Sequence, residues 1–245
     1  MKTINLVLSY IITLVCVCSC NYYIDNDGNN YGRGININGV TWAPVNCGYH
    51  PKDFPYGKMY QWGRKYGQAY ISSENDDTYD DHPIVRTIFS NTYVSVENGN
   101  AYQNAHIFYT PKNFPKVWTK SQDLTLWNSG TEEQPIKTEN DPCPNGWRVP
   151  TSKELKSLAD SGGEWGNYKN MQGMWFYGVT SRVFFPASGA IYDNGFCSMR
   201  ESSGWYWSST PCEIHPYMIF ADDGSSWSDF FNWPVYGYSV RCVKE

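Results

Sequence analysis

The sequence contains few charged side chains and no cluster of basic ones. Asp, Glu, Lys and Arg make up 18% of the chain, and 24 acidic residues outnumber 19 Lys and Arg, which gives a formal net charge of −5. Proteins bind nucleic acid through grouped Lys and Arg side chains that neutralise phosphates. The sequence therefore predicts no nucleic-acid partner.

Residue patterns typical of catalytic, metal and cofactor sites are missing as well. No Gly-rich phosphate loop occurs, and the histidines are too scattered to infer a Ser-His-Asp arrangement. Cys212 and His215 have a ligand-like spacing, but a zinc site needs about four such groups. We expect a protein that is not an enzyme, with no catalytic residue, metal or cofactor. The histidines are His50, His82, His106 and His215.

Acidic residues gather between positions 74 and 81. Carboxylates can coordinate Ca²⁺, but these lack the spacing and the glycine of an EF-hand loop. A solvated loop is the favoured interpretation. The residues are Glu74, Asp76, Asp77, Asp80 and Asp81.

No apolar stretch is long enough to cross a bilayer, which takes about 20 residues. Ile4–Val17 is interrupted by polar residues, as in the apolar part of a secretory signal. The following Val-Cys-Ser-Cys resembles a bacterial lipobox. We expect a lipoprotein signal peptide over residues 1–19 and acyl chains on Cys20 that anchor the protein to a membrane. Ordinary cleavage near Ser19, without a lipid, is the alternative.

Aromatic residues are abundant, at 17% of the chain with 11 Trp and 20 Tyr. Most are expected to pack in a strand-rich core, which the 41% hydrophobic content supports. Flat amphipathic rings on a surface also suit the binding of sugars or proteins. The composition is therefore compatible with a displayed binding surface.

A helix is predicted over residues 152–159. Thr151 and Glu154 form a capping-box pattern, and two leucines follow. Gly162-Gly163 is expected to end the helix.

Short strands with turn signals surround this helix. Residues 20–33 are rich in Asn, Asp and Gly and predict a flexible tether, so a single domain is expected over 34–245. Residues 72–140 predict a long irregular insertion, with Trp118 and Trp127 packed on the core. One helix with many strands indicates an α+β domain. Strands are expected at Ile35–Asn38, Val40–Ala43, Met59–Trp62, Met174–Tyr177, Val183–Pro186, Gly204–Ser208, Tyr217–Ala221 and Tyr238–Val243.

Three segments, 141–155, 206–210 and 238–243, carry a family resemblance. They read DPCPNGWRVPTSKEL, YWSST and YSVRCV. Together they resemble the Fibrobacter succinogenes major paralogous domain family, a bacterial cell-surface module related to the C-type lectin-like fold. The resemblance implies a C-type lectin-like domain with short antiparallel strands, displayed as a surface lipoprotein of the Bacteroides type.

Five cysteines remain once residues 1–20 are set aside. They allow 15 arrangements with one free thiol and two bonds. The resemblance implies a disulfide between Cys143 and Cys242, and reduced buried cysteines are the alternative. The five are Cys47, Cys143, Cys197, Cys212 and Cys242.

The segment 211–234 is the expected ligand-binding surface, because it mixes aromatic with short polar side chains as antibody paratopes do. In related C-type lectin-like proteins diversified by retroelements, the variable positions lie in this stretch. A loop whose aromatics fold back on the core is the alternative. The candidate residues are Tyr217, Asp222, Asp223, Trp227, Phe230, Asn232 and Trp233.

We therefore expect a lipid-anchored adhesion or ligand-binding module at the cell surface or outer membrane, with a glycan or protein ligand. The Glu-Pro-Asn, Gln-Pro-Asp and Trp-Asn-Asp motifs of calcium-dependent lectins are absent. One alternative is a structural or tip subunit of a pilus-like assembly, with pilus subunits as partners. A second, disfavoured, is an oxidase resembling formylglycine-generating enzymes, which would need Cys212 and Cys242 as a reactive pair.

Overall fold

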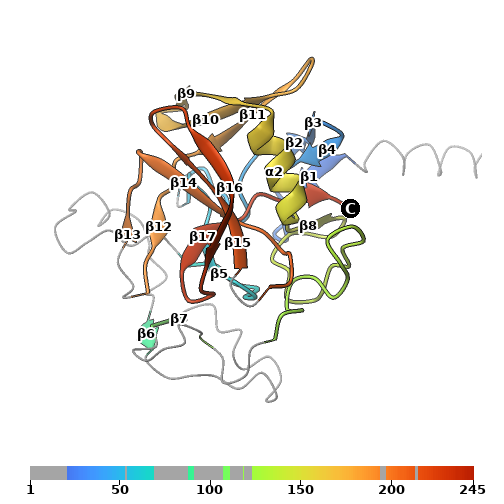
Figure 1. Cartoon of the computed structure of the whole chain (residues 1–245), viewed down its shortest axis with the longest axis vertical. Helices are drawn as coiled ribbons and strands as arrows, with labels where there is room; N and C mark the ends of the chain where they lie inside the picture. The colour runs from blue at the N-terminus through green and yellow to red at the C-terminus, as the bar shows by residue number, and fades with distance from the viewer. Residues whose placement is uncertain are drawn as a thin grey trace, which may run out of the picture.

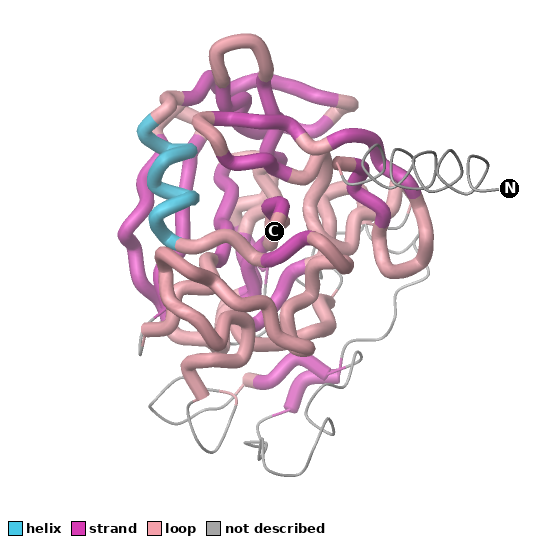
Figure 2. Tube along the Cα trace, turned by 90° about the vertical axis from the view of Figure 1, so that its right-hand side faces the viewer, coloured by secondary structure: helices cyan, strands magenta, loops and turns pink. Residues whose placement is uncertain are grey.

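A computed structural model of the chain describes residues 21–52, 54–68, 88–90, 107–110, 118, 123–193, 197–212 and 215–245 (Figure 1). Strands make up 42% of this structure and helix only 5%. The α+β expectation is therefore wrong, and the described fold is all-β. Figure 2 shows how small a part the helix takes. The strand content was underestimated because many strands are two or three residues long, too short to show an alternating pattern.

A seven-stranded sheet forms the centre of the molecule. Its strands run in the order β13-β12-β17-β14-β15-β16, and β5 pairs with β17 away from this path. All pairings are antiparallel except β14 with β17. The bounds are β5 Met59–Gln61, β12 Ala190–Ile191, β13 Cys197–Ser198, β14 Ser203–Trp207, β15 His215–Ala221, β16 Ser226–Asn232 and β17 Gly237–Ser239.

Both faces of this sheet are covered by core. Successive side chains of a strand point to opposite faces. On β14, Trp207 packs with Trp62 and Trp147 in one cluster, while Tyr206 packs with Phe185 and other apolar residues in a second. Burial on both faces explains why the late strands are apolar at consecutive positions.

Smaller sheets lie around this centre. A four-stranded sheet has the order β3-β4-β18-β8, a three-stranded sheet β11-β10-β9, and two pairs are β1-β2 and β6-β7. The bounds are β1 Tyr22–Ile24, β2 Asn30–Arg33, β3 Ile35–Ile37, β4 Val40–Trp42, β6 Ile88–Ser90, β7 Ile107–Tyr109, β8 Trp147–Arg148, β9 Gly163–Tyr168, β10 Met171–Tyr177, β11 Arg182–Pro186 and β18 Val243–Lys244.

The helix α2, Ser152–Asp160, begins where the sequence predicts. The Thr151 hydroxyl accepts from the backbone N–H of Glu154, and the Glu154 carboxylate accepts from the N–H of Thr151, so both halves of the capping box form. Gly162, at φ 76°, adopts the left-handed conformation just past the helix end. The helix packs on β15 and β16 and places its two buried leucines in the second core cluster.

Residues 21–33 are not a flexible tether. They form the antiparallel pair β1-β2, and Tyr23 is only 1% exposed. Its ring packs edge-on against Trp147, with 5.3 Å between centroids. The tether expectation is wrong because a single core aromatic, surrounded by Asn, Asp and Gly, leaves no periodic signal.

The C-terminal segment, expected as one strand over Tyr238–Val243, is divided between β17 and β18 in two different sheets. Alternate residues of this segment nevertheless pack in the same core cluster. Tyr238, Val240 and Cys242 belong to the first core cluster, whereas Val243 belongs to the second.

Several predictions fall outside the described residues. These are the signal peptide, Cys20, the acidic run at 74–81 and most of the 72–140 insertion. Trp118 and Trp127 are described, and both are buried as expected. Among the described residues, no helix has the length and apolar character needed to cross a bilayer.

Candidate binding site

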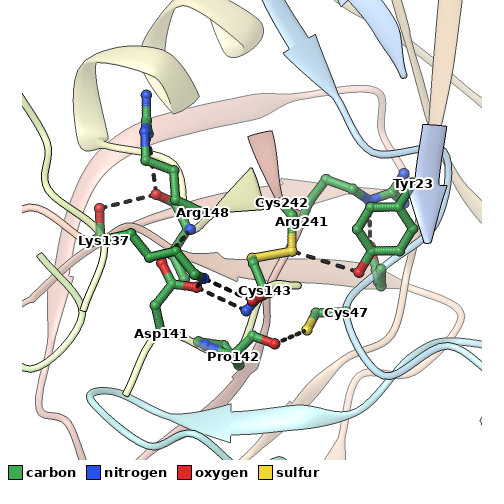
Figure 3. Close-up of a disulfide and its surroundings, with 12 residues drawn as sticks. Tyr23, Cys47, Lys137, Asp141, Pro142, Cys143, Arg148, Arg241 and Cys242 are labelled. Carbon is green, nitrogen blue, oxygen red and sulfur yellow. Dashed lines mark hydrogen bonds and ion pairs between the residues drawn. A yellow bond between two sulfur atoms is a disulfide. The ribbon is translucent and has the colours of Figure 1, made fainter. Parts of the chain in front are cut away.

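The first of the three segments that carry the family resemblance, 141–155, has a structural role. The buried Asp141 carboxylate accepts from the backbone N–H groups of Cys143 and Val149 at 2.8 and 2.9 Å and pairs with Lys137 at 2.7 Å. Burial raises the pKa of Asp141, against the opposing effect of Lys137. These contacts fix the loop that carries Cys143 (Figure 3).

Cys143 and Cys242, the pair that the resemblance implied, form a disulfide across 99 residues of sequence. The thiol of Cys47 lies beside it, and the three sulfur atoms are within 4.8 Å of one another. Since Cys242 is bonded to Cys143, it does not pair with the free, half-buried Cys212 as the oxidase alternative would require.

The second segment, 206–210, is connected to several other parts of the chain by hydrogen bonds. The Trp207 indole donates to the carbonyl of Tyr60, and the Ser208 and Ser209 hydroxyls donate to the carbonyls of Pro216 and Val149. The Thr210 hydroxyl accepts from the backbone N–H of Ser152, the first residue of α2. The residues that carry the resemblance therefore hold the fold together.

The predicted binding segment, 211–234, forms the β15–β16 hairpin, and several of its residues are core. Tyr217 is 6% exposed and packs among aromatic rings, so its expected exposure is wrong. His215 is fully buried against Trp62. The cause is again that β15 is covered on both faces.

The other candidates in this hairpin are dispersed. Asp222 and Asp223 lie in the exposed turn, and Asp223 accepts from Ser225 by two hydrogen bonds, which hold its pKa below the usual value. Phe230 is 45% exposed. Asn232 donates to the Tyr238 hydroxyl at 2.6 Å, Trp233 is half-buried, and the Trp227 side chain lies outside the described structure.

Two cavities lie elsewhere, and Tyr49 lines both of them. Both use the loop between β4 and β5, and their volumes are about 150 and 420 Å³. The smaller is lined by Tyr31, Pro44, Val45, Asn46, Tyr49, Pro55, Tyr168, Lys169, Met171, Phe184, Pro186 and Arg241. The larger is lined by Tyr23, Asp25, Asn26, Asp27, Asn29, Cys47, Gly48, Tyr49, His50, Phe54, Lys58, Tyr60, Lys65, Tyr66, Gly67, Pro142 and Pro144.

Tyr49, the residue that lines both cavities, is held in place by its contacts with Tyr31. Tyr31 donates from its hydroxyl to the Tyr49 carbonyl at 3.1 Å, and the two rings meet edge-on at 5.1 Å between centroids. Nearby, Gly48 has φ 70°, and a β-carbon there would come within 2.9 Å of the Tyr60 hydroxyl. The turn therefore requires glycine.

The larger cavity combines aromatic rings with polar groups. Burial alone would raise the pKa of Asp25, but hydrogen bonds from Asn29 hold it below its usual value, so this carboxylate is ionised and shapes its own loop. The Cys47 side chain is buried, and its thiol donates a hydrogen bond to the Pro142 carbonyl and accepts one from the Tyr60 hydroxyl. Burial raises the pKa of Cys47 to about 11, which makes it a poor nucleophile at neutral pH.

A buried arginine is among the residues that line the smaller cavity. Arg241 is 1% exposed and donates to the Asn46 side chain and to the carbonyls of Ala43 and Phe184. Lys169, in the β9–β10 turn, contributes a second positive charge to the lining. Apolar and aromatic side chains form most of the remaining wall.

Sequence reasoning missed both cavities. The β4–β5 loop carries Pro44, Gly48, Pro51, Pro55 and Gly57 between aromatic residues. This composition is typical of a loop with defined turns, and such loops often carry binding residues. Arg241 belongs to the segment 238–243, where nothing in the sequence marks it as part of a cavity. Its role depends on partners 57 to 198 positions away in sequence, which no local pattern shows.

Comparison with known proteins does not assign these cavities a ligand. No family model matches the chain, and no curated protein or solved structure matches it either.

Proposed function

We propose that the protein is an extracytoplasmic binding module, anchored by a lipid on Cys20, that recognises a glycan or protein ligand. The observation that carries this proposal is the pair of aromatic-lined cavities that meet at Tyr49. Concave sites lined by rings, with a few polar groups, are the usual form of ligand-binding sites.

The cavities are supported by a rigid framework. The Cys143–Cys242 disulfide lies beside Cys47, which lines the larger one. Arg241, which lines the smaller one, is hydrogen-bonded to two other segments, the β4–β5 loop and β11. A pre-formed site loses little side-chain entropy when a ligand binds. Tyrosine rings add contact area together with a polar hydroxyl, which suits sugars and peptide surfaces alike.

The lipid anchor rests on the lipobox-like sequence before Cys20. Cys20→Ala should leave a form that no longer partitions into detergent, whereas the native mature protein should carry the mass of acyl chains. A mature native protein without acyl chains would contradict the anchor but would leave the binding proposal to its own test.

A structural role in a surface assembly is the second candidate. It is favoured by β16, which in the described structure is the outermost strand of the central sheet and exposes Phe230 and Phe231 at 45% and 53%. Exposed edge strands can pair with a strand from another chain.

A glycan and protein array probed with the full chain separates these functions. The binding module predicts saturable binding to a defined ligand by the monomeric protein. Stable incorporation into fibres without such binding would favour the assembly role, and turnover of an array compound would favour an enzyme. Either of the last two results would overturn the proposal.

A further inference from the structure

We propose that the smaller cavity binds a ligand group that consists of a single ring and a carboxylate. This inference rests on the proposed binding function and specifies the chemistry of one part of its site. It is based on the buried charge of Arg241, the charges around the cavity and the shape of its wall.

Arg241 is a buried cation with neutral hydrogen-bond partners. Its Nε donates to Asn46 Oδ1 at 2.7 Å, Nη1 to the Ala43 carbonyl at 2.9 Å, and Nη2 to the Phe184 carbonyl at 2.8 Å. The guanidinium also lies 4.4 Å from the centre of the Phe185 ring. No ion pair to Arg241 occurs within the described part of the chain. Burial of such a charge is costly, and an anion nearby would offset that cost.

The cavity lining has positive charge and, among the described residues, no carboxylate. Arg241 and Lys169 are its only charged members there. The acidic residues Asp25 and Asp27 line the larger cavity instead. An anion in the smaller cavity is therefore attracted by two positive charges, in surroundings where charges interact more strongly than in water.

The β9–β10 hairpin holds Lys169 at the cavity. Tyr168 pairs with Met171, which leaves Lys169 and Asn170 as a two-residue turn, with φ 48° and 64°. Two positive φ values are the geometry of the tight hairpin turns that match strand twist. The Lys169 ammonium lies 5.3 Å from the centre of the Tyr168 ring. The positive charge and the aromatic ring are therefore neighbours in the cavity lining.

The wall and the volume limit the rest of the ligand. Rings of Tyr49, Tyr168 and Phe184, with three prolines, offer flat apolar surface. The volume of about 150 Å³ is below the roughly 300–1,000 Å³ of pockets for drug-sized ligands, so it suits one ring and its carboxylate. Such a group occurs as an acidic sugar or as the C-terminal residue of a peptide.

The test is a titration of the full chain, read from the methyl resonance of Met171, which lines the cavity. D-Glucuronate is compared with D-glucose, and N-acetyl-L-phenylalanine with its amide. We expect the carboxylate member of at least one pair to shift the Met171 signal saturably, and its neutral counterpart to leave it unchanged. The responding pair distinguishes a sugar from a peptide source. Equal binding of both members, or no shift with either carboxylate, would overturn the inference.

A matched pair of variants tests the role of charge. Lys169→Gln should weaken binding of the carboxylate about threefold and reduce its dependence on salt. Lys156→Gln, which removes an exposed cation on α2, should leave binding unchanged. These surface changes avoid the loss of folding that Arg241→Gln risks. Unchanged affinity in Lys169→Gln would overturn recognition by charge.

The outcome is separable from that of the proposed function. Saturable array binding of a neutral ligand, without any Met171 shift by carboxylates, would leave the binding module standing and remove this inference alone. Absence of array binding would remove the proposed function.

Discussion

At the scale of single residues, His215 shows most clearly how burial changes chemistry. Its ring stacks on Trp62, with 3.5 Å between centroids and 10° between planes. Neither ring nitrogen has a hydrogen-bond partner among the described residues. Burial lowers the pKa of His215 to about 3, so the folded protein holds this side chain neutral at physiological pH.

The first prediction is a loss of stability in acid that depends on His215. Because its folded pKa, about 3, lies below the ordinary value of 6.5, only the unfolded state binds the proton between these pH values. The contribution of His215 is complete above pH 6.5 and falls by up to about 1.4 kcal/mol per pH unit as the pH drops toward 3.

His215→Phe keeps the stack on Trp62 and removes the titration. Urea denaturation across this pH range should show a shallower loss of unfolding free energy in the variant than in the native protein. Its stability at pH 7 should be equal or higher, because no hydrogen bond is lost. Parallel pH profiles for the two proteins would refute the buried neutral histidine.

The disulfide leads to the second prediction. Removing both Cys143 and Cys242 opens a loop of 99 residues and should lower the free energy of unfolding by about 4–5 kcal/mol. A double substitution to Ala is required, since a single one would leave a thiol within reach of Cys47. Cys212→Ala is the control and should have little effect. Non-reducing peptide mapping that finds Cys143 and Cys242 free would contradict the bond itself.

At the scale of elements, local signals were predictable and non-local ones were not. The start of α2 depends on Thr151 and Glu154, three residues apart, and the sequence alone predicted it. The β1-β2 hairpin depends on Tyr23 reaching Trp147, and its polar surroundings suggested a tether instead. An element is predictable when the residues that stabilise it are neighbours in sequence.

The third prediction concerns the cap of α2. Thr151→Ala should lower the free energy of unfolding by about 0.5–2 kcal/mol, because the N–H of Glu154 loses its acceptor. Thr151→Ser keeps the hydroxyl and should lose much less. Urea denaturation of the two variants measures the difference. Equal losses in both would show that the methyl packing of Thr151, rather than its hydroxyl, matters.

The fourth prediction concerns the hairpin at 21–33. Tyr23→Ala should cost about 3 kcal/mol of unfolding free energy, because a fully buried ring is removed from the core. Tyr22→Ala, at the half-buried neighbouring position, should cost under about 1 kcal/mol. Thermal and urea denaturation provide both values. Equal stability of the native chain and Tyr23→Ala would restore the tether interpretation.

At the scale of the whole molecule, the sequence predicted a single strand-rich body but not the cavities at Tyr49. Residues 211–234 look like a paratope in sequence, yet the central sheet buries Tyr217 and His215 because core covers both of its faces. The smaller cavity brings together residues from β2, the β4–β5 loop, the β9–β10 hairpin, β11 and the C-terminal segment. Such a site exists only once the fold has formed.

The most direct test of the binding site compares Tyr49→Ala with Phe231→Ala, using the ligand that the array identifies and confirming by thermal denaturation that both variants are folded. Tyr49 lines both cavities, and Phe231 is exposed on β16. We predict that Tyr49→Ala weakens binding at least about tenfold, or about 1.4 kcal/mol, while Phe231→Ala binds as the native protein does. Full affinity in Tyr49→Ala together with lost affinity in Phe231→Ala would contradict the cavity site and place the ligand on the β15–β16 hairpin.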